Sequence, residues 1–383
     1  MENLVTADLA RSAKGAVPSP DFWRGKRVFL TGHTGFKGCW LSLWLTTLGA
    51  RVCGYSLAPS SDPCMFEVLG LAQSCESKIG DIRDKENLQE ELSEFEPEIV
   101  FHLAAQPLVR QSYITPLETF STNVMGTANL LDACRDLTAL RAIVCVTTDK
   151  VYENREWLWA YRETEALGGH DPYSASKACA EFVASAYRNS FFSNDSQISV
   201  ATARAGNIVG GGDWADDRLL PDCIRAITSA QELEIRHPGA IRPWQHALEP
   251  LCGYLLLAEN LFSGNKDYAT AFNFGPSNER LISVKSIVEM VADCWDGALS
   301  FRLHEADAAR HEANILALDS TKSRQLLNWQ PKLSAMKAVQ MSIDWYKAFY
   351  DSGSKTLMID LTENQIADYS RKLCGPTMPD GKD

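Results

Sequence analysis

The sequence contains no long hydrophobic run. A helix that crosses a membrane needs roughly 20 consecutive apolar residues, and no such stretch occurs in the 383 residues. Residues 1–20 also lack the apolar segment of a signal peptide. We therefore expect a cytoplasmic protein without a membrane partner.

Basic residues are scarce relative to acidic ones. The chain has 37 lysines and arginines against 49 aspartates and glutamates, and its net charge is −12. Nucleic-acid binders need a basic surface to neutralise phosphates. This charge balance predicts that nucleic acid is not a partner, although a local basic pocket for a diphosphate remains compatible with it.

Cysteine pairs at metal spacing are absent. The 11 cysteines are scattered singly, with no CxxC pair and no cluster with histidine at the spacing of a zinc site. This distribution favours reduced thiols over a disulfide framework, and it predicts no metal site.

What the sequence does contain is an alternation of short strands and helices. The apolar run at 26–31 leads into a glycine-rich loop, an apolar helix at 39–48 and a second strand at 50–56. A strand–helix–strand opening implies a parallel sheet with right-handed crossovers. The alternation continues with strands at 99–104, 142–147 and 198–203, and helices at 84–95, 119–134 and 174–189. The predicted fold class is α/β, a Rossmann-type doubly wound parallel sheet with a smaller, mostly helical C-terminal domain.

The glycine-rich loop predicts a dinucleotide site. Gly32, Gly35 and Gly38 lie between a strand and a helix, where a side chain would block a pyrophosphate and where the helix N-terminus offers free N–H groups. The loop residues expected to contact the cofactor are Gly32, His33, Thr34, Gly35, Phe36, Lys37 and Gly38.

The adenosine end of the dinucleotide site is less well defined. Residues 54–57, at the end of the second strand, include no acid for the ribose and no arginine for a 2′-phosphate, so this stretch alone does not separate NAD from NADP. Asp81 and Ile82 precede a helix, where we expect an adenine contact. A simple helix cap from Asp81 or Asp84 is the alternative.

Tyr173 and Lys177 form the clearest chemical pair. Their spacing of four residues places both side chains on one helical face. A neighbouring ammonium lowers the pKa of a phenol, which can then act as a base near neutral pH. Thr148 directly follows a predicted buried strand, at the edge of the sheet where α/β proteins bind ligands. The Thr148 hydroxyl can hydrogen-bond the substrate oxygen from which Tyr173 removes a proton.

Several stretches resemble the extended, sugar-nucleotide branch of the short-chain dehydrogenase/reductase superfamily, and within it the family of CDP-glucose 4,6-dehydratases. They are 32–41 (GHTGFKGCWL), 101–110 (FHLAAQPLVR), 147–152 (TTDKVY), 171–177 (DPYSASK), 204–207 (RAGN), 210–214 (GGGDW), 241–250 (IRPWQHALEP) and 272–276 (FNFGP). The likeness runs from about residue 22 to residue 345. It implies NAD as cofactor and CDP-glucose as the small-molecule substrate.

The resemblance implies a role for each catalytic candidate. Tyr173 takes the proton from the sugar 4-hydroxyl, Thr148 orients that oxygen, and Lys177 keeps the phenolate poised and holds the nicotinamide ribose. Asp149 protonates the leaving 6-hydroxyl. Lys150 stands where related dTDP-glucose dehydratases have a glutamate. It acts either as the base that removes the C5 proton or as an electrostatic stabiliser of the enolate.

Binding residues also follow from the resemblance. Leu103, Ala104 and Ala105 are expected at the cofactor, and Asn123 is expected to have a structural and proton-relay role. The substrate candidates are Gln106, Asn207, Asp213, Trp214, Arg218, Arg242 and His311, the last with Glu312 beside it. For Trp214 and for Trp244, plain core packing is the alternative.

Changes in composition along the chain predict an organisation in parts. We expect an N-terminal tail at 1–24, an NAD-binding domain at 25–206 and about 248–276, a substrate domain at about 207–247 and 277–350, and an extension at 351–383. Helices 119–134 and 174–189 are expected to form a homodimer, with a tetramer as the larger possibility. The expected pathway is deoxysugar or O-antigen lipopolysaccharide biosynthesis.

Two other functions stay open at this point. A different sugar-nucleotide dehydratase or a 4-epimerase would use the same tyrosine, lysine and threonine, although an epimerase needs no Asp149–Lys150 pair. An inactive NAD-binding scaffold protein would need none of the five catalytic candidates.

Overall fold

The protein is built around one seven-stranded parallel sheet. A computed structural model describes residues 16–193, 195–276, 282–303, 315–352 and 354–375. The sheet has the order β10-β6-β5-β4-β1-β2-β3, and each neighbouring pair is parallel. Its strands are β1 (Arg27–Thr31), β2 (Arg51–Ser56), β3 (Glu76–Ile79), β4 (Ile99–His102), β5 (Ala142–Val146), β6 (Ser199–Ala205) and β10 (Ala271–Phe274). The predicted fold class is confirmed.

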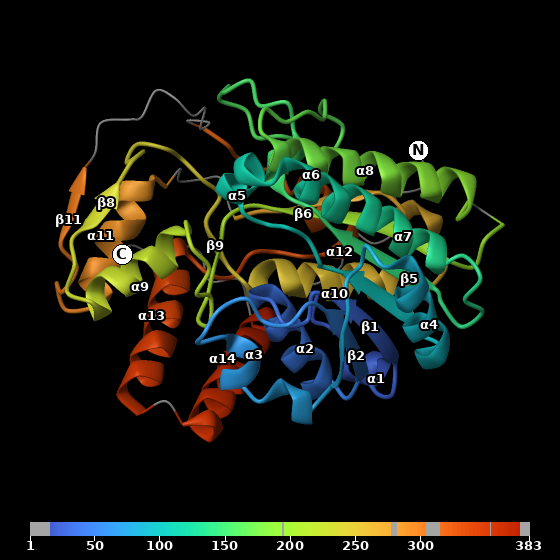
Figure 1. Ribbon diagram of the computed structural model, residues 1–383, viewed down its shortest axis with the longest axis horizontal. Helices are drawn as coiled ribbons and strands as arrows, with labels where there is room; N and C mark the ends of the chain where they lie inside the picture. The colour runs from blue at the N-terminus through green and yellow to red at the C-terminus, as the bar shows by residue number, and fades with distance from the viewer. Residues whose placement is uncertain (1–15, 194, 277–281, 304–314, 353, 376–383) are drawn as a thin grey trace.

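Helices cover both faces of this sheet (Figure 1). Successive residues of β1 point to opposite faces, so Val28 and Leu30 join one hydrophobic cluster and Phe29 joins another. α2 (Phe36–Thr47) and α10 (Leu248–Phe262) pack on the first face, and α4 (Lys85–Phe95), α7 (Gly126–Ala133) and α8 (Pro172–Ser190) pack on the second. Burial on both faces explains why the central strands are continuous apolar runs.

The two edge strands of the sheet differ in how much of their surface is buried. β10 lies beside β6, and all four of its residues are buried. β3 has no counterpart in the prediction because it is a four-residue edge strand whose residues are only partly buried or exposed. An edge strand with one covered face lacks the apolar pattern that marks its neighbours.

The predicted helix at 119–134 is a run of three segments. These are α6 (Pro116–Phe120), the π-helical turn η3 (Ser121–Met125) and α7. The π turn contains Asn123, whose Nδ2 donates to Ser176 Oγ at 2.8 Å. π-helical turns inside helices often occur at functional sites, and this one joins the central helix to α8.

The C-terminal lobe lies to the left of the sheet in Figure 1. It contains α9 (Leu219–Thr228), α11 (Val284–Cys294), α13 (Ala335–Ser352) and a small sheet of β8 (Leu233–Ile235) with β11 (Phe301–Leu303). The remaining elements are α1 (Pro20–Trp23), α3 (Met65–Val68), η2 (Leu71–Gln73), α5 (Val109–Ile114), η4 (Asp149–Val151), β7 (Ile208–Val209), β9 (Gln245–His246), η5 (Lys266–Tyr268), α12 (Thr321–Leu327) and α14 (Lys355–Cys374).

Both ends of the described chain pack on the core. Trp23 is fully buried, and its Nε1 donates to Glu259 Oε1 at 2.7 Å, so ordered packing begins before Gly25. In α14, the Tyr369 hydroxyl donates to Glu249 Oε2 at 2.7 Å, and its ring meets Trp44 edge-on. The C-terminal extension thereby braces α2, the helix that follows the glycine-rich loop.

The described residues show no membrane-spanning helix and no metal-ligand cluster, and their cysteines are unpaired. Within the described ranges, no helix combines the length and the hydropathy needed to span a bilayer. The same residues contain no group of three or more histidine, cysteine or acidic side chains placed to hold a metal ion. All 11 cysteines are free thiols, and eight of them are buried.

Candidate active site

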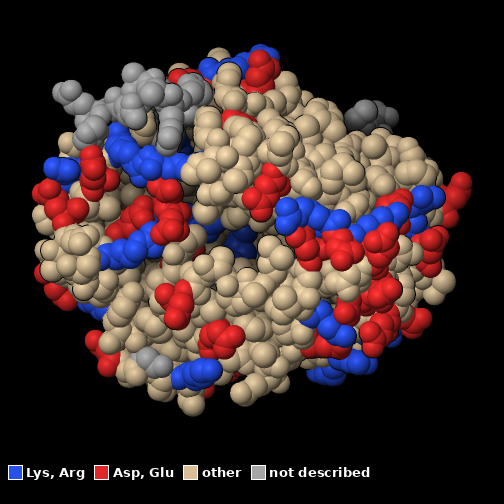
Figure 2. Space-filling view, viewed as in Figure 1, with Lys and Arg blue, Asp and Glu red and all other residues tan. Residues whose placement is uncertain are grey.

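A cavity of about 460 Å³ opens at the carboxyl ends of β5 and β6, between the sheet and the C-terminal lobe. Figure 2 shows it as a hollow near the centre of the face, with basic side chains at its base. Its lining includes ten of the predicted site residues: Phe36, Lys37, Thr148, Asp149, Lys150, Tyr173, Asn207, Asp213, Arg218 and Arg242. Residues distant in the sequence therefore meet in one place.

The segment after β5 turns immediately into the 3₁₀ helix η4. Thr148 is the N-cap of η4, and its Oγ1 accepts a long hydrogen bond from Lys150 N at 3.4 Å. The same hydroxyl donates to Asp149 Oδ1 at 3.0 Å. This turn brings all three side chains to the cavity from consecutive positions.

Asp149 has the surroundings of a carboxylic acid rather than a solvated carboxylate. It is 2% exposed, and burial raises its pKa, while Lys150 and the hydrogen bond from Thr148 oppose the rise. Its Oδ2 has no hydrogen-bond partner. A Cβ on Gly206 would come within 3.0 Å of that oxygen, so the glycine leaves room beside it.

Tyr173 is held at the start of α8. Asp171 caps the helix by accepting hydrogen bonds from the backbone N–H and the hydroxyl of Ser174, at 2.9 and 2.6 Å. Burial raises the pKa of Tyr173 to about 12, and a hydrogen bond with Thr148 opposes this rise. Arg218 is the cation that also lowers it.

Lys177 lies one turn further along α8 and deeper in the protein. It is 7% exposed, and its Nζ donates to the Val146 carbonyl at 3.2 Å. Burial lowers the pKa of Lys177 to about 8. The lysine is thus anchored to the end of β5, which leads to Thr148.

The glycine-rich loop is compact enough to exclude side chains. Gly32 has φ of +79°, and a Cβ there would be 2.7 Å from Ala104 N, which brings the predicted stretch 103–105 against the loop. A Cβ on Gly38 would be 2.0 Å from the Gly32 carbonyl oxygen. α2 begins at Gly35 without a side-chain cap and without an acid in its first turn. These features fit a bound pyrophosphate.

Neutral side chains occupy the end of β2. His33 Nε2 bonds Ser77 Oγ at 2.7 Å, and Thr34 Oγ1 bonds Ser56 Oγ at 2.6 Å. Burial lowers the pKa of His33 to about 4, so its ring is neutral. This end therefore presents hydroxyl groups in place of the acid that most dinucleotide sites use for the ribose.

Asp81 does not cap α4. Asp84 does so, because its Oδ1 accepts from Asn87 N at 3.1 Å. Asp81 Oδ2 instead accepts from Arg83 Nε at 2.9 Å. Ile82 is buried against Gly126, where an added Cβ would lie 2.4 Å from its Cδ1.

The predicted substrate residues divide into two groups. Arg218 Nη1 pairs with Asp213 Oδ2 at 2.9 Å in the cavity wall. Trp214 is not among the lining residues, and its ring packs against Trp345, Tyr346 and Phe349. Trp214 thus attaches the loop at 210–214 (GGGDW) to α13.

Gln106 is engaged with the protein. Its Nε2 donates to Thr119 Oγ1 at 2.9 Å, and its backbone N–H donates to Asn123 Oδ1 at 2.8 Å. Gln106 itself is absent from the cavity lining, whereas its neighbours Pro107 and Leu108 are present. The contact of Gln106 with the substrate stays a prediction, as do the ligand contacts expected of the other site residues. His311 and Glu312 lie outside the described residues.

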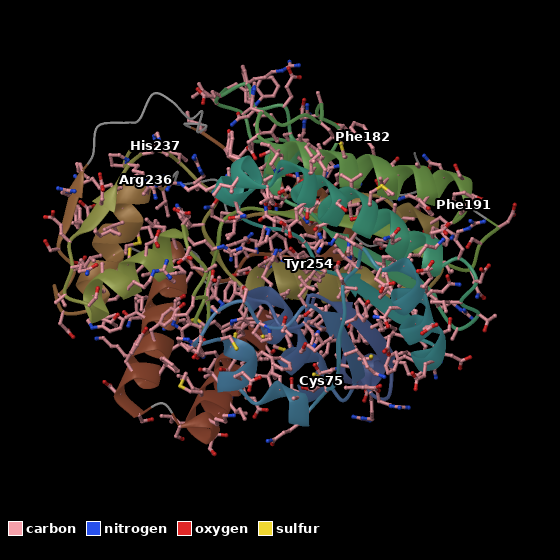
Figure 3. All side chains as sticks on the ribbon, viewed as in Figure 1. Cys75, Phe182, Phe191, Arg236, His237 and Tyr254 are labelled. Atoms are coloured by element: carbon pink, nitrogen blue, oxygen red, sulfur yellow. The ribbon has the colours of Figure 1, made fainter. Side chains whose placement is uncertain are left out.

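Sequence reasoning missed an ion-pair chain at the cavity. Asp217 Oδ1 lies 3.0 Å from Arg110 Nη1 and 3.3 Å from Arg236 Nη2, and all three residues line the cavity. Arg110 comes from α5, whereas Arg236 follows β8 on the C-terminal lobe, where Figure 3 labels it beside His237. Arg110 ends the quoted stretch 101–110, which was the available signal. Nothing local marked Arg236.

Comparison with known proteins identifies the family. A family model described as GDP-mannose 4,6 dehydratase matches residues 29–342. CDP-glucose 4,6-dehydratase from Salmonella typhimurium is 48% identical over 353 residues, which cover 91% of this chain and 97% of that relative. The chain belongs to this dehydratase family. CDP-paratose 2-epimerase from Salmonella typhi is 25% identical, over 83% of this chain and 98% of that protein.

Solved structures agree on the fold of this family member. UDP-glucuronic acid 4-epimerase from Bacillus cereus, in complex with UDP-glucuronic acid and NAD, superposes with a TM-score of 0.73 at 20% identity, over 85% of this chain and 100% of the other. UDP-glucose 4-epimerase from Brucella ovis, in complex with NAD, has a TM-score of 0.72 at 21% identity, over 83% and 97% of the two chains. At these identities the likeness concerns the fold.

Proposed function

We propose that the protein converts CDP-glucose to CDP-4-keto-6-deoxyglucose with loss of water, and that it uses bound NAD. The observation that carries the proposal is the buried carboxyl of Asp149 in the same cavity as Tyr173 and Lys150. A 4-epimerase has no step that requires such an acid. The 48% identity to a CDP-glucose 4,6-dehydratase supports the choice of reaction and nucleotide.

The first step belongs to Tyr173 and Thr148. Tyr173 removes the proton from the sugar 4-hydroxyl, and Thr148, which hydrogen-bonds the phenol, holds the same substrate oxygen. Since burial raises the pKa of the phenol, a cation must stabilise its ionised form. Arg218 has that effect in the structure, and Lys177 supplies a second positive charge beneath the site.

The second step removes water across C5 and C6. The 4-ketone acidifies the C5 proton, and Asp149 donates its proton to the leaving 6-hydroxyl, as a carboxyl with a raised pKa can near neutral pH. Lys150 either accepts the C5 proton or stabilises the enolate by its charge. The chemistry supplied by bound NAD is acceptance of the C4 hydride and its later return to C6.

The cofactor assignment to NAD rests on the loop and on the end of β2. The loop leaves no space for a side chain between Gly32 and Gly38. The first N–H groups of α2 have no side-chain cap, so they are available to a phosphate at the N-terminus of the helix. The predicted cofactor residues His33 and Thr34 bond the serines at the ribose end. That end offers neither an acid for the ribose nor an arginine for a 2′-phosphate, and the choice of NAD over NADP is supported by solved structures of the same fold that are in complex with NAD.

The nucleotide occupies the half of the cavity formed by the C-terminal lobe. Arg242 and Asn207 line this region and are suited to the diphosphate, because arginine pairs with phosphate through two parallel hydrogen bonds. Leu220, Leu233 and Ile235 form an apolar wall that suits the flat face of a base.

We also propose a cytoplasmic homodimer, or a tetramer built from it, that acts in deoxysugar or lipopolysaccharide biosynthesis. The side chains of Leu117 and Met125 on the central helix are 84% and 55% exposed, and Phe182 on α8 is 59% exposed. Figure 3 labels Phe182 on the outer surface of α8. Exposed apolar groups on adjacent helices are typical of an interface.

One assay separates the candidate functions. Purified protein is incubated with CDP-glucose, and the product is examined by mass spectrometry and by the absorbance of 4-keto sugars in alkali. Heating the protein releases any bound NAD for measurement. A product that has lost water supports the proposal. An isomer of unchanged mass would identify a 4-epimerase. NAD release without turnover of CDP-glucose, or of the UDP-, GDP- and dTDP-sugars tested in parallel, would identify a scaffold protein.

A further inference from the structure

A buried ion pair lies beneath the active site. Arg204 Nη2 is 2.8 Å from Glu181 Oε2, and Arg204 Nε donates to Oε1 at 2.9 Å. Both side chains are only 4% exposed. Neither residue lines the cavity, and neither has a role in the chemistry proposed above.

Both partners of this pair make further hydrogen bonds. Glu181 Oε1 also accepts from Thr147 Oγ1 at 2.5 Å, and Oε2 accepts from Thr202 Oγ1 at 2.7 Å. Arg204 Nη1 donates to the Tyr152 hydroxyl at 2.9 Å. These hydrogen bonds offset much of the cost of burying two charges.

The pair joins the three segments that carry the catalytic and binding candidates. Glu181 lies one helical turn after Lys177 on α8, and Thr147 directly precedes Thr148. Arg204 stands at the end of β6, three residues before Asn207. The Tyr152 hydroxyl extends the network to Asn273 Oδ1 on β10, at 2.7 Å. One carboxylate thus connects α8 to the ends of β5 and β6.

Glu181 also differs electrostatically from the other groups around Lys177. Burial raises the pKa of Cys145 on β5 to about 12 and lowers that of His102 on β4 to about 3, so both are neutral near pH 7. Lys37 on α2 carries positive charge when protonated. Hydrogen bonds from Arg204, Thr147 and Thr202 lower the pKa of Glu181 and keep it ionised. Of these described neighbours, Glu181 alone is an anion at neutral pH.

We propose that Glu181, paired with Arg204, is a positioning residue for the reaction: it fixes the register of the Thr148 turn against the Lys177 helix and keeps Lys177 cationic. The inference rests on the proposed function for its catalytic part. Burial lowers the pKa of Lys177, while Cys145 and the Glu181 carboxylate oppose that effect. Since the raised pKa of Cys145 keeps its thiol uncharged near pH 7, Glu181 is the charged member of the two. A cationic Lys177 adds to the effect of Arg218 in favouring the phenolate of Tyr173.

The test must distinguish this role from simple scaffolding. Glu181→Leu leaves Arg204 buried without its partner, and a large fall in Tm is expected. The double variant Glu181→Leu/Arg204→Met removes both charges and keeps similar volume, so Tm is expected to return close to the wild-type value. Any defect that persists in the double variant reports on catalysis and not on folding.

In the double variant we expect kcat at pH 7 to fall about tenfold or more, with KM within about twofold. The alkaline limb of the kcat–pH profile is expected to move about one unit toward lower pH, because Lys177 loses its proton earlier. Glu259→Gln is the matched control, since it alters a largely buried carboxyl that bonds Trp23, far from the cavity. Its pH profile is expected to match that of the wild type.

A readout independent of turnover is the pH dependence of the free energy of unfolding. The pKa of Lys177 is lower in the folded than in the unfolded state, so stability rises with pH between about 8 and the unfolded value. In the double variant this rise is expected to begin at lower pH. Subtracting the curve measured in a Lys177→Met background isolates the contribution of Lys177.

Two outcomes would overturn the inference. One is a double variant with wild-type kcat, pH profile and stability curve, which would make the pair a scaffold only. The other is a catalytic defect that disappears whenever Tm is restored. If the wild-type protein fails to dehydrate CDP-glucose, the proposed function fails, while the stability curves still decide whether Glu181 controls the charge of Lys177.

Discussion

The Thr148 hydroxyl donates to Asp149 Oδ1 at 3.0 Å and leaves Asp149 Oδ2 without a partner. The same hydroxyl also acts on Tyr173, because its interaction with the phenol lowers the pKa of that group. The proposed base of the first step and the proposed acid of the second therefore lie on either side of a single hydroxyl.

Asp149→Asn should stop the loss of water and spare the oxidation. We expect dehydration to fall about 10²- to 10⁴-fold, since the amide cannot donate an acidic proton. Because burial raises the pKa of Asp149, its acid form persists above the usual pH range, and wild-type dehydration should decline once the pH exceeds that pKa. Product masses after incubation with CDP-glucose measure the effect.

Tyr173→Phe tests the oxidation step, whereas Asp149→Asn tests the loss of water. It should abolish the oxidation itself and leave the fold intact, as judged by circular dichroism and Tm. Wild-type turnover in Tyr173→Phe would refute the assignment of the base. Dehydration at the normal rate in Asp149→Asn would refute the assignment of the acid.

Lys150→Arg separates the two roles left open for this lysine. Arginine keeps the charge but does not give up its proton in proteins. If Lys150 is electrostatic, turnover should drop less than about tenfold, whereas a base role predicts a loss of about 10²-fold or more. Exchange of the C5 proton with deuterated solvent measures this step directly, with Lys150→Met as the variant that loses both properties.

Arg218→Met should make Tyr173 a weaker acid. Arg218 lowers the pKa of the phenol, so its removal raises that pKa, and the rising limb of the kcat–pH profile should move to higher pH by about one unit. Arg218→Lys, which retains the charge, should restore most of the shift. An unmoved limb in Arg218→Met would show that the guanidinium does not act on the phenol.

Gly38→Ala should disrupt cofactor binding. An added Cβ would lie 2.0 Å from the Gly32 carbonyl oxygen, so the loop must move, and we expect NAD affinity to fall more than about tenfold together with a lower Tm. Calorimetry with NAD gives the affinity. Gly239→Ala is the control, because nothing lies within 4 Å of its Cβ; equal losses in both variants would argue against the steric explanation.

The sequence by itself determined the central strands and the helices that alternate with them, and it placed the candidate residues at the ends of those strands. Apolar runs mark the central strands because both faces of that sheet are buried. The glycine-rich loop at Gly32 and the spacing of Tyr173 and Lys177 are local patterns, each contained within a few consecutive residues. The position of Thr148 directly after a buried strand was also predictable from the sequence.

Only the tertiary structure decided which of these residues share surroundings. It directs Trp214 into the packing of α13 and turns Gln106 toward Thr119, choices that depend on partners far along the chain. It also pairs Glu181 with Arg204 beneath the site and joins Arg110 to Asp217 at the cavity. No local pattern encodes such contacts, because each depends on how separate strands and lobes come together in space.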